Sequence, residues 1–277
     1  MDFVEDARWF APTAEGGQEP GRVTLVGAGP GAADLLTLRA ARALQQAQMV
    51  LYDNLVSQDV LDLVHPDAQR IYVGKSASRH TLPQEAIIDL MLRLARSGRN
   101  LVRLKGGDGY IFGRGGEEAL ALAQAGIPFE VIPGITAAQG AGACAGIPLT
   151  HRDHAATLVF ATGHLRAGKD VALDWQALAR PHQTVVIYMG IGTLPIICEQ
   201  LQAHGLAGDT PAALVERATL PNQRCVTGTL AQLPQLAQEH GIKAPALIII
   251  GHVVSLHAQL QPGCQTVAPA PELQPAP

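Results

Sequence analysis

The sequence predicts an α/β protein built from two domains, and three observations support this prediction. Short continuous apolar runs alternate with segments of helical periodicity along most of the 277 residues, a pattern typical of buried strands connected by helices. The chain is 47% hydrophobic but only 4% aromatic, so small aliphatic side chains must build the core. A stretch bearing glycine and proline, from Gly146 to His154, separates the pattern into two halves.

The expected strands are apolar runs that end at glycine, proline or polar residues. In the first half they are residues 22–27, 48–54, 69–74, 100–107 and 128–134, and in the second half 156–164, 184–190, 212–218, 225–230 and 246–254. The expected helices are 34–48, 84–97, 116–124, 137–145, 194–204 and 231–240. Pro83 in the first turn and Gly98 just past the end match the known preferences at helix ends.

These segments predict the limits of the domains. We expect an N-terminal α/β domain at 21–145, a joint at 146–155 and a C-terminal α/β domain at 156–258, with a ligand cleft between the domains. Residues 1–20 are expected to form a flexible arm, and the proline-rich residues 259–277 a disordered tail.

Charge and targeting signals exclude several classes of protein. The net charge of −4 argues against a general nucleic-acid binder, which usually carries a basic face. The N-terminus lacks the order of a signal peptide, and no apolar stretch approaches the roughly 18 residues of a membrane span. We therefore expect a cytoplasmic protein with neither a nucleic-acid nor a membrane partner. His151, Asp153 and His154 have no further ligand cluster beside them, so no metal site is predicted.

The first glycine-rich loop admits two ligands. Gly27, Gly29 and Ala32 satisfy the dinucleotide pattern G-x-G-x-x-G/A, and Asp53, 26 positions after Gly27, would then bind a ribose of NAD or FAD. Pro30 instead completes the run G-x-G-P-G, which indicates a different ligand. A purely structural turn is a third possibility for this segment.

The segment 101–120 contains a second strand followed by a glycine turn. Asp108 in this turn can accept hydrogen bonds from ligand hydroxyls. Arg114 lies between glycines in a loop, where an arginine has little to bury, so we expect it to bind a ligand. Glu117 and Glu118 open the next helix, whose N-terminus favours negative charge.

Further candidate positions follow at helix starts and strand ends. Thr136 and Ala137 begin a helix of small residues, which either presents backbone groups to a ligand or packs closely on a neighbour. Arg152 in the joint is suited to bind a carboxylate. Met189 and Ala218 lie at strand ends, where open α/β sheets bind ligands, although Met189 could equally be part of the core.

Taken in order, the motifs VGAGPGAADLLTLRA, GGDGYIFGRGGEE, PGITAA, GIPLTHRD, YMG and VERAT resemble those of the tetrapyrrole methylases. The resemblance extends from Arg22 to Val254, and it is strongest to the uroporphyrinogen-III C-methyltransferases. Neither a nucleophile elbow G-x-S-x-G nor a P-loop is present. The G-x-G-P-G loop therefore resembles a methylase loop and not a dinucleotide loop.

This resemblance implies a fold, a cofactor and a reaction. It implies a class III methyltransferase of two α/β domains that forms a homodimer and binds S-adenosylmethionine between the domains, releasing S-adenosylhomocysteine. The implied substrate is uroporphyrinogen III, methylated at C2 and C7 to precorrin-2 for siroheme, cobalamin or haem d1. The implied cofactor contacts are Pro30, Gly106, Gly107, Asp108, Ile111, Thr136, Ala137, Met189, Ala218 and Ala246.

The proposed substrate bears eight carboxylates, so an acidic protein needs local cations to bind it. Arg114 and Arg152 are the expected ligands of these carboxylates, and Glu117 is expected to orient Arg114, which is itself a poor base. No general base is assigned. Lesser candidates for the substrate are Lys75, Arg39 and His151.

Gly109 departs from the family pattern, which commonly has proline after the GGD acid. Glycine there loosens the loop through the entropy of the unfolded chain. Three alternative functions stay open: methylation of a later corrin intermediate, NAD-dependent oxidoreduction, and a non-catalytic tetrapyrrole carrier. Because only a short arm precedes the first strand, we expect no fused oxidase–chelatase module, and the reaction is expected to stop at precorrin-2.

Overall fold

The computed structural model describes residues 19–74, 82–164 and 173–260. The chain divides between Thr136 and Ala137 into two compact units, called unit 1 and unit 2 here. This division differs by one helix from the expected limit after residue 145, because α5 (Ala137–Cys144) belongs to unit 2. The reason is local: the backbone N–H of Ala138 donates to the Tyr188 hydroxyl at 3.0 Å, within unit 2. Most of the expected arm and tail lies outside the described residues.

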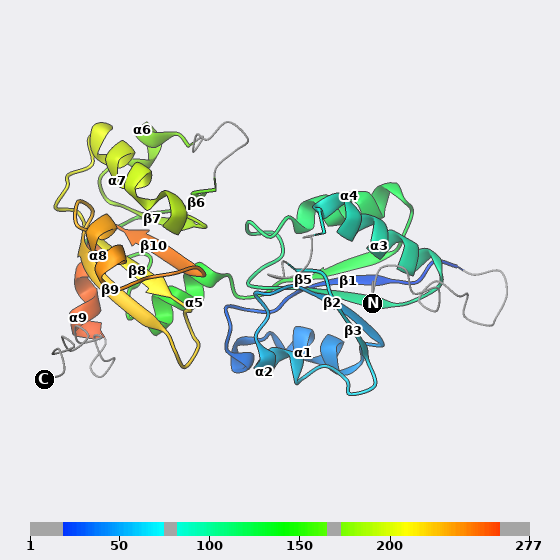
Figure 1. Ribbon diagram of the computed structural model, residues 1–277. Helices are drawn as coiled ribbons and strands as arrows, with labels where there is room; N and C mark the ends of the chain where they lie inside the picture. Colours follow the sequence, from blue (N-terminus) through cyan, green and yellow to red (C-terminus); the bar gives the residue numbers. More distant parts are fainter. Residues whose placement is uncertain (1–18, 75–81, 165–172, 261–277) are drawn as a thin grey trace, which may run out of the picture. The chain divides into compact units, whose positions relative to one another are not determined.

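Unit 1 contains a five-stranded, fully parallel sheet (Figure 1). Its strands are β1 (Val23–Gly27), β2 (Met49–Tyr52), β3 (Gln69–Tyr72), β4 (Leu101–Lys105) and β5 (Phe129–Ile132). The strand order is β3-β2-β4-β1-β5, with every neighbouring pair parallel. All carboxyl ends of these strands therefore meet at one edge, where open α/β sheets bind ligands.

Helices cover both faces of this sheet (Figure 1). One face carries α3 (Gln84–Arg96) and α4 (Gly115–Gln124), and a core of aliphatic residues fills the space between them and the strands. The other face carries α1 (Leu38–Gln45) and α2 (Gln58–Leu61) over a second core. With apolar cores on both faces, every residue of β4 is buried.

The first helix begins later than its periodicity predicts. Residues Ala33–Leu35 form a 3-10 turn instead of the expected start of the helix at residue 34. The Thr37 hydroxyl accepts a hydrogen bond from Ala40 N at 3.2 Å, so Thr37 caps α1 at its N-terminus. The capping threonine therefore decides where this helix begins.

Unit 2 contains a five-stranded mixed sheet with the order β6-β7-β10-β8-β9. Its strands are β6 (Thr157–Thr162), β7 (Gln183–Tyr188), β8 (Pro211–Glu216), β9 (Arg224–Thr229) and β10 (Ala246–Ile250). Only β6 and β7 are parallel, whereas the other three pairs are antiparallel. All ten strands expected from the sequence are confirmed.

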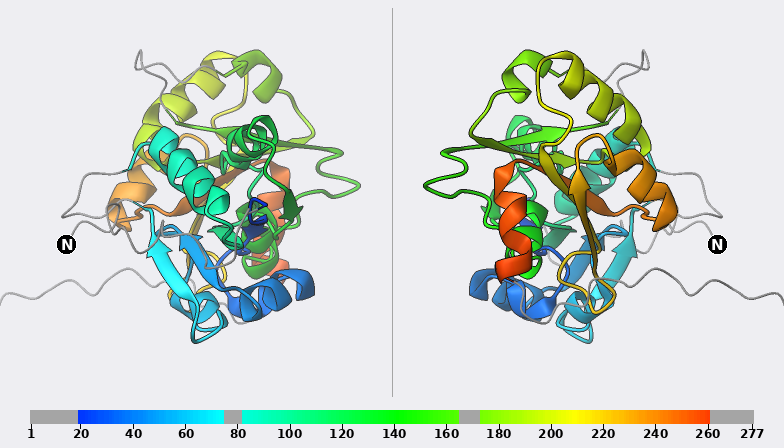
Figure 2. Two further views of the ribbon diagram at one scale, coloured as in Figure 1. Left: turned by 90° about the vertical axis from the view of Figure 1, so that its right-hand side faces the viewer. Right: turned by 90° about the vertical axis from the view of Figure 1, so that its left-hand side faces the viewer.

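Helices α6 (Trp175–Leu178), α7 (Leu194–Ala203) and α8 (Leu233–Glu239) share one apolar core with this sheet. Elsewhere in unit 2, α9 (His257–Leu260, red in Figure 2) lies beside the green helix α5, and the His257 ring contacts the Ala145 carbonyl oxygen. Within the described ranges, none of the helices combines the length and the apolar character needed to cross a membrane.

Candidate functional site

Three loops meet at the carboxyl edge of the unit 1 sheet. The loop after β1 pairs with the loop after β4, because Gly29 and Gly107 exchange backbone hydrogen bonds of 3.1 and 2.7 Å. Ala28 N also donates to the Lys105 carbonyl oxygen at 2.8 Å. Pro30 follows Gly29 in the loop after β1 and is half-buried. The G-x-G-P-G and GGD motifs thus form one surface, although the paired Gly29 and Gly107 are 78 positions apart in sequence.

At three positions in these loops, neighbouring parts of the protein leave no room for a Cβ atom, so glycine is required. A Cβ on Gly27 would lie 2.4 Å from Gly134 N, and one on Gly134 would lie 2.3 Å from the Gly107 oxygen. Gly106 is approached by the Leu55 side chain, whose Cβ would lie 2.6 Å from an added methyl group. Gly27 and Gly106 were expected to belong to ligand-binding loops, and in this structure the protein's own segments make the close approach to them.

Asp108 holds two of these loops together. Its Oδ1 accepts from Tyr110 N at 2.8 Å, and its Oδ2 accepts from Gly134 N at 3.0 Å, in the loop after β5. Each carboxylate oxygen can accept a second hydrogen bond. Asp108 is thus an organiser of the edge that retains capacity to bind a ligand.

Arg114 lies at the N-terminus of α4 in the left-handed backbone region, with φ of 59°. Its Nε and one terminal nitrogen donate to the two Glu117 oxygens at 2.8 and 2.6 Å, which fixes the plane of the guanidinium. These hydrogen bonds raise the pKa of Arg114 and lower that of Glu117. Arg114, like any arginine in a protein, is a permanent cation, and its two hydrogen bonds to Glu117 hold it in one orientation. Ile111, which precedes Arg114 in the same loop, donates its backbone N–H to the Asp108 carbonyl oxygen.

Strained backbone gathers in the loops that contain two of the expected site residues, Arg114 and Met189. In the described parts of the chain, six residues other than glycine have positive φ, and five of them lie in the loop after β4 or in the segments that follow β7 and β8. Such conformations cost about 1–3 kcal/mol each and cluster at functional sites. The five are Phe112, Arg114, Met189, Arg217 and Thr219.

In unit 2, the expected contacts meet at one edge of the mixed sheet. Met189 follows β7, Ala218 follows β8 and Ala246 begins β10. Arg217 N donates to the Pro245 carbonyl oxygen at 3.0 Å, which joins two of these segments. The bond from Ala138 to the Tyr188 hydroxyl brings the start of α5, and with it Ala137, to the same edge. Met189 is 53% exposed, so it is not a core residue.

The remaining candidates have separate locations. Thr136 is buried and ends unit 1. Arg152 is exposed in a turn closed by backbone bonds between His151 and Ala155, in unit 2. Arg39 forms an ion pair with Glu130 on the surface of unit 1.

Lys75 lies outside the described residues. In residues 19–74, 82–164 and 173–260, no group of three or more His, Cys, Asp or Glu side chains could hold a metal ion.

A buried charge network under the GGD loop was missed by the sequence analysis. Arg103 and Lys105 on β4 both contact Glu118 of α4, which is fully buried. Glu118 was expected merely to favour the helix N-terminus. Alternation in LVRLK places both cations on one face of a central strand, and that pattern could have signalled a buried acidic partner.

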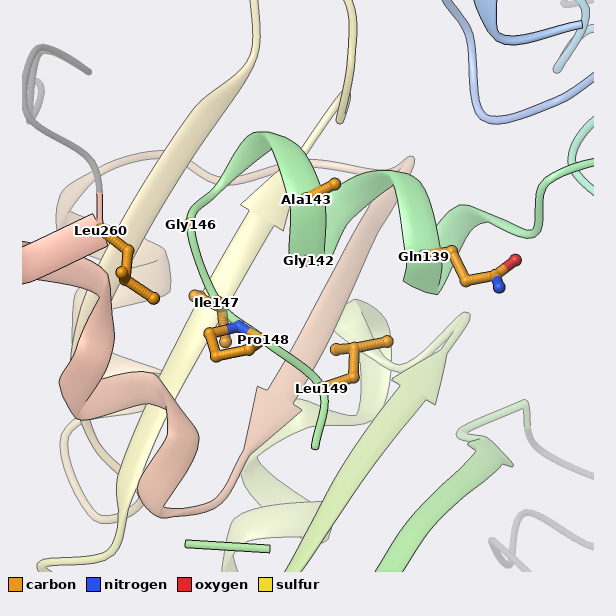
Figure 3. Close-up of a pocket in the computed structure, with 8 residues that line it drawn as sticks. All are labelled: Gln139, Gly142, Ala143, Gly146, Ile147, Pro148, Leu149 and Leu260. Atoms are coloured by element: carbon orange, nitrogen blue, oxygen red, sulfur yellow. The ribbon is translucent and has the colours of Figure 1, made fainter. Parts of the chain in front are cut away.

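A shallow apolar hollow of about 410 Å³ lies elsewhere in unit 2 (Figure 3). Figure 3 shows Ile147, Pro148 and Leu149 along the segment that follows α5, with Leu260 of α9 at another side. None of the expected cofactor contacts lines it. Its chemistry is apolar, so we do not assign the candidate site to this hollow.

Residues 22–234 match the family model of the Tetrapyrrole (Corrin/Porphyrin) Methylases. The chain belongs to this family. The match covers both glycine loops, the Arg114–Glu117 pair and the ends of β7 and β8. Membership removes the dinucleotide alternative for the first loop, whose expected ribose ligand Asp53 is instead paired with Arg103 at 3.3 Å.

Among curated relatives, the siroheme synthase of Nitrosomonas europaea is 58% identical over 240 residues, which is 87% of this chain and 50% of that protein. The siroheme synthase of Thioalkalivibrio sulfidiphilus is 57% identical over 246 residues, or 88% of this chain and 50% of that protein. The chain thus spans about half the length of these relatives.

Among solved structures, the uroporphyrin III C-methyl transferase of Thermus thermophilus has a TM-score of 0.74 and 40% identity, covering 90% of this chain and 98% of that one. A structure of the Thermus enzyme complexed with S-adenosylhomocysteine has a TM-score of 0.72 and 41% identity, covering 84% and 93%. A cobalt precorrin-4 methyltransferase has a TM-score of 0.74 but only 29% identity, covering 84% and 95%.

Proposed function

We propose that this chain transfers methyl groups from S-adenosylmethionine to C2 and C7 of uroporphyrinogen III, giving precorrin-2. The observation that carries the proposal is the joined edge of unit 1, where the G-x-G-P-G and GGD loops pair beside the oriented cation Arg114. Similarity to the Thermus enzyme over nearly its whole length supports this substrate over a later corrin. Siroheme synthesis is the proposed use of the product, as in the curated relatives' name.

The residues present fit the proposed cofactor. The edge of unit 1 offers polar backbone and the spare acceptor capacity of Asp108 to a polar ligand. The edge of unit 2 offers small side chains that take up little room beside a ligand, namely the half-buried Ala137 and Ala246 and the buried Ala218, together with the exposed Met189. The remaining proposed contacts are Pro30, Gly106, Gly107, Ile111 and Thr136.

Methylation needs positioning more than acid–base chemistry. Bound S-adenosylmethionine supplies a methyl carbon made electrophilic by the attached sulfonium. The protein's contribution is to hold an electron-rich pyrrole carbon in line with that methyl and to exclude water. Arg114 is proposed to bind a substrate carboxylate through its remaining terminal nitrogen, since Glu117 occupies the other side of the guanidinium. Arg152 is proposed to bind a second carboxylate.

A transfer assay tests this function. The enzyme is incubated without oxygen with enzymatically generated uroporphyrinogen III and S-adenosylmethionine labelled in the methyl group. Label is expected in the tetrapyrrole fraction, and S-adenosylhomocysteine is expected to raise the unfolding temperature. Transfer only to a later corrinoid would shift the proposal to that substrate. Binding of the tetrapyrrole without any transfer would favour a carrier.

We also propose that the chain forms a homodimer, which rests on its resemblance to the family. Light scattering after size-exclusion chromatography is expected to give twice the mass of 29.1 kDa. A single mass of one chain at micromolar concentration would contradict the dimer.

A further inference from the structure

Four charged side chains form the network that lies under the GGD loop. Glu118 Oε1 accepts from Arg103 Nε at 3.2 Å and from Lys105 Nζ at 3.0 Å. Gln84 Nε2 at the start of α3 donates to the same oxygen at 3.0 Å. A terminal nitrogen of Arg103 reaches the Asp53 Oδ2 at 3.3 Å. Arg103 thus bridges a carboxylate in the core and one at the end of β2.

The charges of this network balance only when Asp53 is included. Arg103 and Lys105 are 2% and 4% exposed, and Glu118, the carboxylate that both of them contact, is fully buried. Two buried cations against a single anion would be costly. Asp53 supplies the second negative charge, and its side chain is 21% exposed. The network therefore runs from the core out to the surface of the site.

Asp53 belongs to the same edge as the glycine loops. Its Oδ1 accepts from Leu55 N at 3.1 Å, which closes a turn after β2. The Leu55 side chain of that turn packs against Gly106. Asp53 is therefore a partly exposed carboxylate in the loop cluster that holds the proposed reactants.

A buried ion network is weak evidence for stability, because apolar residues of similar volume often stabilise a core equally well or better. Its geometry indicates a different use. Arg103 also donates to the carbonyl oxygens of Leu51 and Leu104, the latter at 2.8 Å. The guanidinium is thus held on several sides, and the direction of its contact with Asp53 is fixed.

We propose that Arg103 is a positioning residue, which Glu118 anchors in the core so that it holds the Asp53 carboxylate in one orientation toward the bound reactants. This inference rests on the proposed methyl transfer. Only arginine has the required fork, because its Nε and terminal nitrogen contact two carboxylates at once. Lysine at this position keeps the charge balance but has a single nitrogen, which cannot occupy both places.

The variant Arg103→Lys tests the geometry with the charge conserved. We expect kcat to fall about tenfold or more, while the KM for S-adenosylmethionine and the Kd for S-adenosylhomocysteine change less than threefold. Arg22→Lys is the matched control, since Arg22 pairs with Glu130 at 3.5 Å on the surface of unit 1; it is expected to leave kcat unchanged. A kcat within twofold of wild type in a folded Arg103→Lys protein would overturn the proposal.

Two variants of Glu118 separate positioning from stability, and they also serve if Arg103→Lys does not fold. Glu118→Gln keeps an oxygen at the place of Oε1 but removes the charge. Glu118→Asp keeps the charge but shortens the side chain and draws Arg103 away from Asp53. Positioning predicts the larger loss of kcat in Glu118→Asp and the larger loss of stability in Glu118→Gln. If kcat instead falls more in Glu118→Gln, the variant expected to lose more stability, the proposal is overturned.

A crystal structure of Arg103→Lys provides a readout that does not depend on turnover. We expect the Asp53 carboxylate to leave the position it has in wild type. An unmoved Asp53 would count against the positioning role even if the kcat of Arg103→Lys falls. Conversely, a wild-type enzyme that transfers no methyl to uroporphyrinogen III would count against the proposed function and leave this structural readout to decide the role of Arg103.

Discussion

The Asp108 carboxylate accepts a hydrogen bond from Gly134 N at 3.0 Å and so joins the loop after β4 to the loop after β5. Asp108 and Gly134 are 26 positions apart in sequence. Gly134 lies so close to the carbonyl oxygen of Gly107, the neighbour of Asp108, that no side chain fits between the two loops. One carboxylate thus sets the spacing of two segments that are proposed to bind the cofactor. A change at Asp108 is therefore expected to alter the whole edge.

Asp108→Ala is expected to weaken binding of S-adenosylhomocysteine about tenfold or more. Removing the carboxylate leaves two backbone N–H groups without their acceptor, a loss of about 1–3 kcal/mol, and the loops are expected to separate. Titration calorimetry measures the affinity, with Asp67→Ala, an exposed turn residue, as the control. An unchanged affinity in Asp108→Ala would remove Asp108 from the cofactor site.

Arg114→Gly is expected to lower kcat/KM for uroporphyrinogen III by about 10- to 100-fold, the range for a lost hydrogen bond to a charged group. Glycine adopts the left-handed conformation of this position without steric cost, so the protein is expected to stay folded and to keep its affinity for S-adenosylhomocysteine. Arg114→Ala, which retains the strained backbone, is the companion variant. Full turnover in either protein would show that Arg114 does not bind the substrate.

Gly109→Ala is expected to stabilise the protein by about 0.4–1 kcal/mol, because alanine reduces the freedom of the unfolded chain. The φ of Gly109 is outside the left-handed region, and an added Cβ would meet only the Lys105 side chain, at 3.4 Å. Differential scanning calorimetry is expected to show a small rise in Tm. Gly115→Ala is the contrast, since its Cβ would lie 2.5 Å from the Gly109 oxygen, and a fall in Tm is expected there.

The buried ammonium group of Lys105 is expected to make the stability of the protein depend on pH. Burial, followed by the neighbouring Arg103, lowers its pKa in the folded protein. Between this lowered pKa and its ordinary value near 10.4, the unfolded state binds more protons than the folded state, so the contribution of Lys105 to stability rises with pH. The difference in free energy of unfolding between wild type and Lys105→Met is therefore expected to rise through this alkaline window.

Urea titrations at several pH values measure that difference. A flat or falling difference for Lys105→Met would mean that the ammonium is not destabilised by its surroundings.

Much of the fold could be predicted because its elements have strong local signals. Each strand is an apolar run bounded by glycine, proline or polar residues, so all ten were found. The antiparallel pairing of β8 and β10 could not be predicted, because a buried strand has the same apolar pattern in either direction. Helices of four residues, such as α2 and α6, are too short to display a period.

The places of the candidate residues in the fold could be predicted where they depend on motifs that are local in sequence. Asp108, Arg114 and Met189 lie at or soon after the ends of their strands, as expected, since the motifs mark those ends. The bridge from Arg103 to Glu118 and Asp53 was not predicted, because it joins residues 15 and 50 positions apart across the sheet. The packing of α4 on β4 brings Glu118 to Arg103, and the pairing of β2 with β4 brings Asp53 there.

The central claim is the double methylation of uroporphyrinogen III. The most direct measurement is mass spectrometry of the tetrapyrrole after anaerobic incubation with the enzyme and S-adenosylmethionine. Two added methyl groups, located at C2 and C7 by nuclear magnetic resonance, are the predicted result. No added methyl group, in a preparation that still binds S-adenosylhomocysteine, would contradict the claim.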